Sequence, residues 1–264
     1  MLLSEPQETP ADFHFRIGQT PVRVTGWFWP AVGLFGWGTS QSLAGDNTRM
    51  LLIYLAVWVI VVFCSILVHE VGHALAFAVC GQSSRIVLYH FGGLAVPTGV
   101  PAQALKKPSR RLLVSAAGPL AQLCLAVVVI TGLILCGYRV PDAGFLRSVP
   151  IIGDFLDEAS SAGQPIPTLL GRLVVYHLLF VNIGWALLNL LPVQPLDGGH
   201  VVLESLNVCG VSAAEQISNF FGLLIAGTLA LWAYQHQETY LMFLFGFLCV
   251  GCYQRLVANR ARLW

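Results

Sequence analysis

The sequence predicts an all-α polytopic membrane protein of about six transmembrane helices, with a small membrane-associated β-segment. Hydrophobic residues make up 56% of its 264 residues, and the mean hydropathy is +0.72. Charged residues make up only 10%, against roughly 25% in soluble domains. The apolar residues also gather into runs long enough for membrane helices, which need about 20 residues each.

The first 26 residues are polar and precede the apolar runs. Residues 13–24 have the pattern of strand, turn and strand, which predicts a short β-hairpin. The chain starts with an acidic, proline-containing segment rather than a basic one, so we expect no cleaved signal peptide. We therefore expect a cytoplasmic hairpin domain at 1–26, a membrane-embedded domain at 27–257 and a basic cytoplasmic tail at 258–264.

Six apolar runs define the expected membrane spans. The first, residues 27–44, is short and rich in tryptophan and phenylalanine, so it is either a span that extends to Ala44 or an interfacial segment. The other five are clearer, although the last is near the lower length limit. They are residues 50–79, 112–137, 169–191, 216–234 and 239–254.

Basic residues predict the orientation of these spans. The connection between the second and third spans has no acidic residue and carries Arg85, Lys106, Lys107, Arg110 and Arg111. Such an excess is typical of cytoplasmic loops. The basic C-terminal tail agrees, whereas the 1–26 and 192–215 segments add no support. With six spans, both termini are then cytoplasmic.

Net charge and cysteine content exclude some classes of function. A net charge of +1 indicates no nucleic-acid partner. The seven cysteines are odd in number and lie in or beside apolar segments, so we expect no disulfide framework. The Cys249-x-x-Cys252 pair is either a redox or metal pair or two small packing residues, and the packing interpretation is favoured on an apolar helix.

The second apolar run ends in a His-Glu-x-x-His motif formed by His69, Glu70 and His73. On a helix, positions i and i+4 are about 40° apart, so both histidines can bind one metal ion while Glu70 acts as a base. Ionisable groups in a bilayer cost roughly 2.5–3.5 kcal/mol each, and less for neutral histidine. A bound cation compensates for this cost, and a catalytic zinc site uses three protein ligands.

Asp197 is the best candidate for the third ligand. It follows a segment in which Pro192 and Pro195 break an apolar helix, and it precedes Gly198 and Gly199, which we expect to free the backbone. Broken helices at membrane depth occur only where protein or a water-filled cavity satisfies the backbone. A hydrolytic site needs such a cavity. The alternative is a plain interfacial turn.

Together the two segments resemble the site-2 protease family of intramembrane zinc metalloproteases. That family pairs His-Glu-x-x-His with a distant Asn-x-x-Pro-x-x-x-Leu-Asp-Gly, and residues 189–198 match the second pattern. The resemblance implies that one zinc ion per chain is bound by His69, His73 and Asp197. It also implies that Glu70 is the catalytic base, and it places the motif asparagine at Asn189.

The resemblance covers nearly the whole chain. Gly92 and Gly93 follow a strand-like run, as in the family's membrane-associated β-segment, and Gly118-Pro119 opens the next span. One departure is that the family's Gly-Pro-x-x-Asn motif ends in Gln122 here. The 138–167 connection is too short for the PDZ domain of some relatives, so the resemblance is to a minimal, sporulation-type membrane core.

The implied chemistry is hydrolysis of a peptide bond in or near the membrane. Glu70 would accept the proton of the attacking water and pass it to the leaving amine, while Asn189 helps to hold the developing oxyanion. The substrate helix must be locally unwound first. Residues 85–91, followed by Gly92 and Gly93, then offer a strand edge for the extended substrate; the alternative is a structural hairpin at the lipid headgroups.

Three more polar residues lie near these motifs. Asn182 either extends the polar helix face of Asn189 or bonds across helices. His177 is expected to be a core histidine. His200, three residues after Asp197, is expected either to support the ligand or to have a structural role, rather than to bind the metal.

Three functions compete. The favoured one is a metalloprotease in a prokaryotic cytoplasmic membrane, which cleaves membrane-protein substrates in regulated intramembrane proteolysis or remnant clearance. The others are an inactive relative that binds membrane proteins and a metal-ion transporter. The three expected ligands, His69, His73 and Asp197, and the expected base, Glu70, are all present, which argues against an inactive relative. A transporter has no need of a glutamate beside the first histidine.

Overall fold

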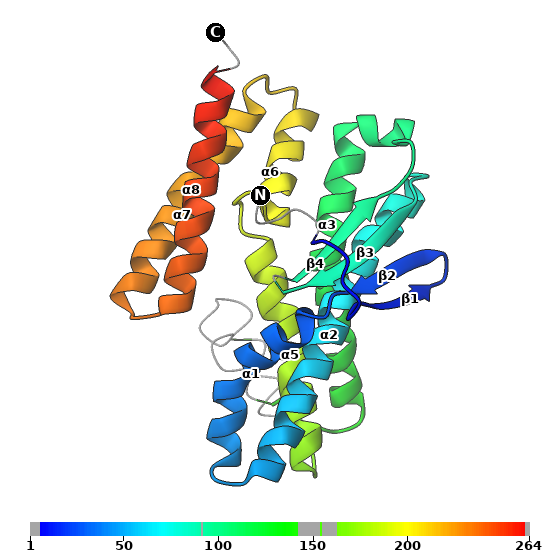
Figure 1. Ribbon diagram of the computed structural model, residues 1–264, viewed down its shortest axis with the longest axis vertical. Coiled ribbons are helices and arrows are strands. Elements are labelled where there is room, and N and C mark those ends of the chain that lie inside the picture. Colours follow the sequence, from blue (N-terminus) through cyan, green and yellow to red (C-terminus); the bar gives the residue numbers. More distant parts are fainter. Residues whose placement is uncertain (1–5, 91, 142–153, 155–162, 262–264) are drawn as a thin grey trace. The chain divides into compact units, whose positions relative to one another are not determined.

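The computed structural model describes residues 6–90, 92–141, 154 and 163–261 (Figure 1). It confirms a helical architecture with a small sheet. Within the described residues, five helices are long and apolar enough to cross a membrane. They are α2 (Thr48–Val79), α3 (Pro108–Leu135), α5 (Leu169–Asn189), α7 (Ala214–Gln235) and α8 (Thr239–Ala261).

The expected first span forms the shorter helix α1, Phe28–Ala44. Its 17 residues are about 25 Å long at 1.5 Å per residue, less than the roughly 30 Å of a bilayer core. Five of the six predicted spans therefore meet the length and composition of a membrane helix, and α1 does not.

The contacts of the chain define two compact units. Unit 1 consists of Met1–Pro101 and Leu120–Ala186, and unit 2 consists of Ala102–Pro119 and Leu187–Trp264. Helices α3 and α5 each contribute residues to both units. Each unit has its own apolar cluster.

A four-stranded sheet in unit 1 has the order β1-β2-β3-β4. The predicted hairpin is confirmed as β1 (Phe13–Ile17) and β2 (Thr20–Val24), which pair antiparallel. Strand β2 also pairs in parallel with β3 (Ser84–Tyr89), and β3 pairs antiparallel with β4 (Gly92–Pro97). The strand edge predicted at residues 85–91 is therefore wrong, because β3 is paired on both sides. The edge strand at this end of the sheet is β4.

One face of this sheet belongs to the core of unit 1. Val22 and Val24 of β2 lie opposite Ile86 and Leu88 of β3, and all four side chains are buried. Alternate residues of a strand point to the same face, which explains this spacing. The cluster continues onto the helices through Phe28, Val32, Val62, Ile66, Ala74 and Val181.

The N-terminal segment is tied to the sheet by Arg23 and Asp12. The Arg23 guanidinium lies 3.3 Å from the Asp12 carboxylate and 3.5 Å from that of Glu8. Burial raises the pKa of Asp12, but hydrogen bonds from Thr9 and Gly26 and the charge of Arg23 lower it by a larger amount. The pKa is therefore below its ordinary value. Asp12 is therefore an ionised anchor for the residues before β1.

Unit 2 is built on helices α7 and α8, which lie side by side as an antiparallel pair (Figure 1). Cys252 is buried among Val193, Ala226 and Phe245, and its thiol donates to the Gln194 carbonyl at 3.5 Å. Cys249 packs against the same apolar cluster. Both side chains of the Cys-x-x-Cys pair therefore lie where the packing interpretation expects them.

Helix α1 packs on α2 through a close contact between Gly36 and Trp58. A Cβ atom on Gly36 would lie 2.1 Å from Cδ1 of Trp58, whose Nε1 donates to the Val32 carbonyl at 2.9 Å. We expect Gly36→Ala to displace the indole and to cost about 1–3 kcal/mol of stability. Thermal unfolding in detergent measures the loss.

Gly33→Ala is the matched control on the same helix, because nothing lies within 4 Å of a Cβ atom there. It should leave stability unchanged or raise it by up to about 1 kcal/mol through helix propensity. An equal effect of the two substitutions would contradict the assigned contact.

Candidate metal centre

The His-Glu-x-x-His motif lies in the last three turns of α2. This helix starts at an Asn47 cap, whose side chain accepts from the Met50 N–H at 3.1 Å, and it is apolar over most of its length. His69, Glu70 and His73 are all buried, with exposed fractions of 4%, 3% and 8%. Buried ionisable groups are costly unless other polar groups satisfy them, so their partners define the site.

Gln122 of α3 fixes the orientation of the His69 ring. Its Nε2 donates to the Ser65 carbonyl at 3.2 Å, and its Oε1 lies 2.9 Å from Nδ1 of His69. Because the Ser65 carbonyl can only accept, the amide oxygen faces the imidazole and Nδ1 carries the proton. Neutral His69 then presents an unprotonated Nε2, which is the form that binds a metal.

The two motif histidines converge at their Nε2 atoms, which lie 3.0 Å apart. Two nitrogen ligands at about 2.05 Å from a tetrahedral zinc ion are about 3.3 Å apart. The observed pair is close to this spacing, and two imidazole nitrogens are donors that zinc prefers. The residues of unit 1 therefore fit two ligands of a zinc ion.

Glu70 lies against the sheet through Gly93. A Cβ atom on Gly93 would lie 2.4 Å from both Cγ and Oε1 of Glu70, so only glycine leaves room for this carboxylate. Burial and, next, the negative charge of Glu70 raise the pKa of Tyr89 on the neighbouring strand. The start of β4 therefore borders the carboxylate of the motif.

Gly92 has a different requirement. Its φ of +128° lies in a region that favours glycine, and a Cβ atom would lie 3.1 Å from the Trp185 ring. The sequence assigns Gly92 and Gly93 to substrate binding, which stays a prediction. Their structural roles, a backbone turn and room for Glu70, were not foreseen.

Asn182 bonds across helices, which decides between its two interpretations. Its amide donates to Oγ of Ser65 on α2 and to the Leu178 carbonyl, both at 2.8 Å. Sequence analysis missed Ser65, although it lies one turn before His69 on the same helix face. His177 is buried with its ring edge-on to Trp58 at 5.2 Å, as expected of a core histidine.

The second motif occupies a turn in unit 2. Helix α5 ends at Asn189, and α6 (Asp197–Val208) begins at Asp197. Gly198 and Gly199 are helical, and Cβ atoms on them would lie 2.2 Å from the Leu190 oxygen and 2.4 Å from the Gln194 nitrogen. The expectation that these glycines free the backbone is wrong. They allow α6 to start in contact with the preceding turn.

Two further contacts hold this turn. The Arg255 guanidinium of α8 donates to the Gln194 carbonyl at 3.2 Å, and Ser218 of α7 donates to the Gly199 carbonyl at 3.2 Å. Asp197 is half-buried at the N-terminus of α6, where the helix dipole favours a carboxylate. His200 is half-buried one turn later.

The predicted site residues thus fall into two groups. Unit 1 contains His69, Glu70, His73, Gly92 and Gly93. Unit 2 contains Asn189 and Asp197, at the two ends of one turn.

Comparison with known proteins identifies the family. Residues 57–231 match the model of peptidase family M50. This segment is more than half of the chain and includes both motifs. The chain belongs to peptidase family M50.

Two individual proteins are similar to this M50 member. A protein of Synechocystis sp., named as an inferred zinc metalloprotease, is 30% identical in an alignment of 176 positions that covers 62% of this chain and 37% of the relative. The chain thus spans little more than a third of that relative. The solved structure of the site-2 protease from Methanocaldococcus jannaschii has the same fold, with a TM-score of 0.52 and 20% identity, over 93% of this chain and 95% of the other.

Replacing Gln122 tests the orientation of His69. We expect Gln122→Leu to raise the Zn²⁺ dissociation constant about 10–100-fold, because Nδ1 of His69 loses its acceptor. Competition with a chelating dye measures it on the purified chain. Gln122→Glu is the matched variant that keeps the acceptor, so it should bind Zn²⁺ more tightly than Gln122→Leu does. Unchanged affinity in Gln122→Leu would refute the role of Gln122.

Replacing Gly93 tests its contact with Glu70. We expect Gly93→Ala to lower stability by about 1–3 kcal/mol, because its methyl group overlaps the glutamate. In a Glu70→Ala background the space is free, so the same substitution should cost little. Thermal unfolding of the four proteins in this double-mutant cycle gives the coupling. Equal losses in both backgrounds would show that the two residues do not compete for space.

Proposed function

We propose that this M50 member is an intramembrane zinc metalloprotease that cleaves membrane-protein substrates in or next to a transmembrane segment. One observation carries the proposal: His69 and His73 converge, with Glu70 beside them, on a buried face of the apolar helix α2. The inferred zinc-protease activity in the name of the Synechocystis relative agrees with it.

We propose that Asp197 joins His69 and His73 as the third ligand of one zinc ion per chain. Two imidazoles and a carboxylate are a ligand set known from catalytic zinc sites, which keep a fourth position open. Bound zinc supplies a Lewis acid that makes water nucleophilic near neutral pH and polarises a peptide carbonyl. The position of Asp197 at a helix N-terminus, next to a tightly packed turn, supports a fixed ligand.

Glu70 is the proton carrier in this proposal. Its carboxylate accepts a proton from the attacking water and delivers it to the leaving amine. The contact with Gly93 limits where the carboxylate can lie. Asn189 supplies an amide N–H for the developing oxyanion.

The substrate in this proposal is an unwound, extended segment that adds to the edge of β4 (Gly92–Pro97). Its backbone N–H and C=O groups, freed from the helix, pair with those of β4 as in other cases of strand addition. The small residues at the start of β4 permit a close backbone approach, and this end of the strand borders Glu70.

We place the protein in a prokaryotic cytoplasmic membrane with both termini in the cytoplasm, acting in regulated proteolysis or remnant clearance. The basic residues between α2 and α3, in a segment that contains no acidic residue, support this orientation. It requires α1 to cross the bilayer as a sixth span, in spite of its 17 residues.

The proposal is tested by Glu70→Gln. We expect it to retain zinc but to lower cleavage by about 10²–10⁴-fold, because only the proton acceptor is removed. Membrane proteomes of cells that express either protein should differ in fragments and in uncleaved precursors. Glu215→Gln, an exposed glutamate, is the matched control. Identical proteomes for wild type and Glu70→Gln would refute the protease assignment.

Zinc content tests the ligand set in the same preparations. Asp197→Ala should lose most of its zinc, because only two of the three proposed ligands, the imidazoles, remain. Full zinc retention in Asp197→Ala would remove this residue from the site.

A further inference from the structure

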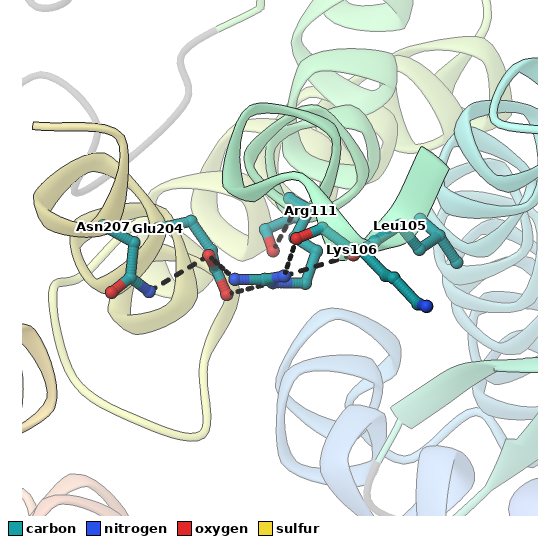
Figure 2. A network of polar contacts seen from close by, with 6 residues as sticks. Leu105, Lys106, Arg111, Glu204 and Asn207 are labelled. Atoms are coloured by element: carbon teal, nitrogen blue, oxygen red, sulfur yellow. Dashed lines mark hydrogen bonds and ion pairs between the residues drawn. The ribbon is translucent and has the colours of Figure 1, made fainter. Parts of the chain in front are cut away.

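An ion pair joins two elements of unit 2 that are far apart in the sequence (Figure 2). Arg111, in the first turn of α3, donates from Nε and Nη2 to the two carboxylate oxygens of Glu204 on α6, both at 2.7 Å. This two-bond geometry fixes the orientation of both side chains as well as their distance. Glu204 is almost fully buried, with a side-chain exposed fraction of 9%.

The remaining contacts make the pair rigid. Nη1 of Arg111 donates to the carbonyls of Leu105 and Lys106, both at 3.1 Å, at the end of the short helix η1 (Gln103–Lys106). Asn207 donates to the Glu204 carboxylate at 3.2 Å. Figure 2 shows the guanidinium between the carboxylate and these two carbonyls. Four of the five N–H donors of Arg111 are therefore used.

Glu204 shares a helix face with Asp197. The two residues are seven positions apart, which places them within about 20° of each other around the axis and about 10 Å apart along it. A rotation of α6 about its axis would move both carboxylates by the same angle. A contact that fixes Glu204 therefore fixes the direction in which Asp197 points.

Helix α6 depends on such contacts. It has 12 residues, and its N-cap residue, Leu196, makes no side-chain cap. Helices of this length are marginal on their own. Ser218 and the packing of Gly198 and Gly199 hold its first turn, whereas Arg111 holds it at Glu204, about two turns further along.

We infer that Arg111 and Glu204 are positioning residues for zinc binding, because their ion pair sets the rotation of α6 that aims Asp197 at the metal. This inference rests on the proposed role of Asp197 as third ligand. According to this inference, the ion pair affects metal affinity through Asp197. A contact that only stabilises the fold would not have an effect that depends on Asp197.

Zn²⁺ titration of the purified full chain tests the inference by competition with a chelating dye. We expect Arg111→Gln and Glu204→Gln each to raise the dissociation constant about tenfold. In an Asp197→Ala background, Arg111→Gln should cause no further change, since the residue through which it acts is gone. Arg110→Gln, the exposed neighbouring arginine, is the control and should change the constant less than twofold.

Two further variants separate charge from geometry. Arg111→Lys keeps the positive charge but cannot form the paired hydrogen bonds of a guanidinium to both oxygens of Glu204, so it should weaken zinc binding measurably. The exchange of both residues, Arg111→Glu with Glu204→Arg, should restore part of the lost affinity. If Arg111→Gln does not fold, the decision falls to Arg111→Lys, whose effect must again vanish in the Asp197→Ala background.

The outcomes distinguish this inference from the proposed function. Wild-type zinc affinity in Arg111→Gln or, where that variant does not fold, in Arg111→Lys, or an equal loss in both backgrounds, overturns the positioning role alone. If Asp197→Ala itself binds Zn²⁺ like the wild type, the proposed ligand set fails and the inference fails with it.

Discussion

The structure depends on the burial of two imidazoles and a carboxylate on one apolar helix. His69, Glu70 and His73 lie on α2 with little exposure, where unsatisfied polar groups are costly. Neighbouring elements reduce this cost in different ways: α3 supplies Gln122 to His69, and the sheet leaves room for Glu70 at Gly93. The polar site thus determines which residues its neighbours can carry.

Glycines are as important to this arrangement as the polar side chains. Gly93 lets β4 approach Glu70, and Gly198 and Gly199 let α6 begin against the residues before it. In each case a Cβ atom would overlap the neighbouring group. The glycines therefore act by allowing two chain segments to meet, whereas Gly92 alone at these motifs needs its backbone conformation.

Sequence analysis could predict the features that depend on local pattern. The helix spacing of His69 and His73, the helix break before Asp197 and the strand alternation of the hairpin are all signals of a few residues. It could not predict β4, whose glycine start is a weak strand signal, and it therefore gave the sheet edge to the wrong strand. Sequence analysis noted Gln122 only as a departure from the family's motif and missed Ser65, because the roles of both residues depend on which helices pack together.

The charge pattern shows the same limit. Glu204 stands in a segment without a basic residue, and by sequence it weakens the case for a cytoplasmic location. Its partner is Arg111, 93 positions earlier. The two charges neutralise each other, so neither reports on the orientation of the chain. Lys106, Lys107 and Arg110 still form a basic cluster without acidic neighbours in sequence, and acidic residues contribute little to the positive-inside rule. The apparent exception at Glu204 is thus a structural contact, and the predicted orientation rests on the remaining basic residues.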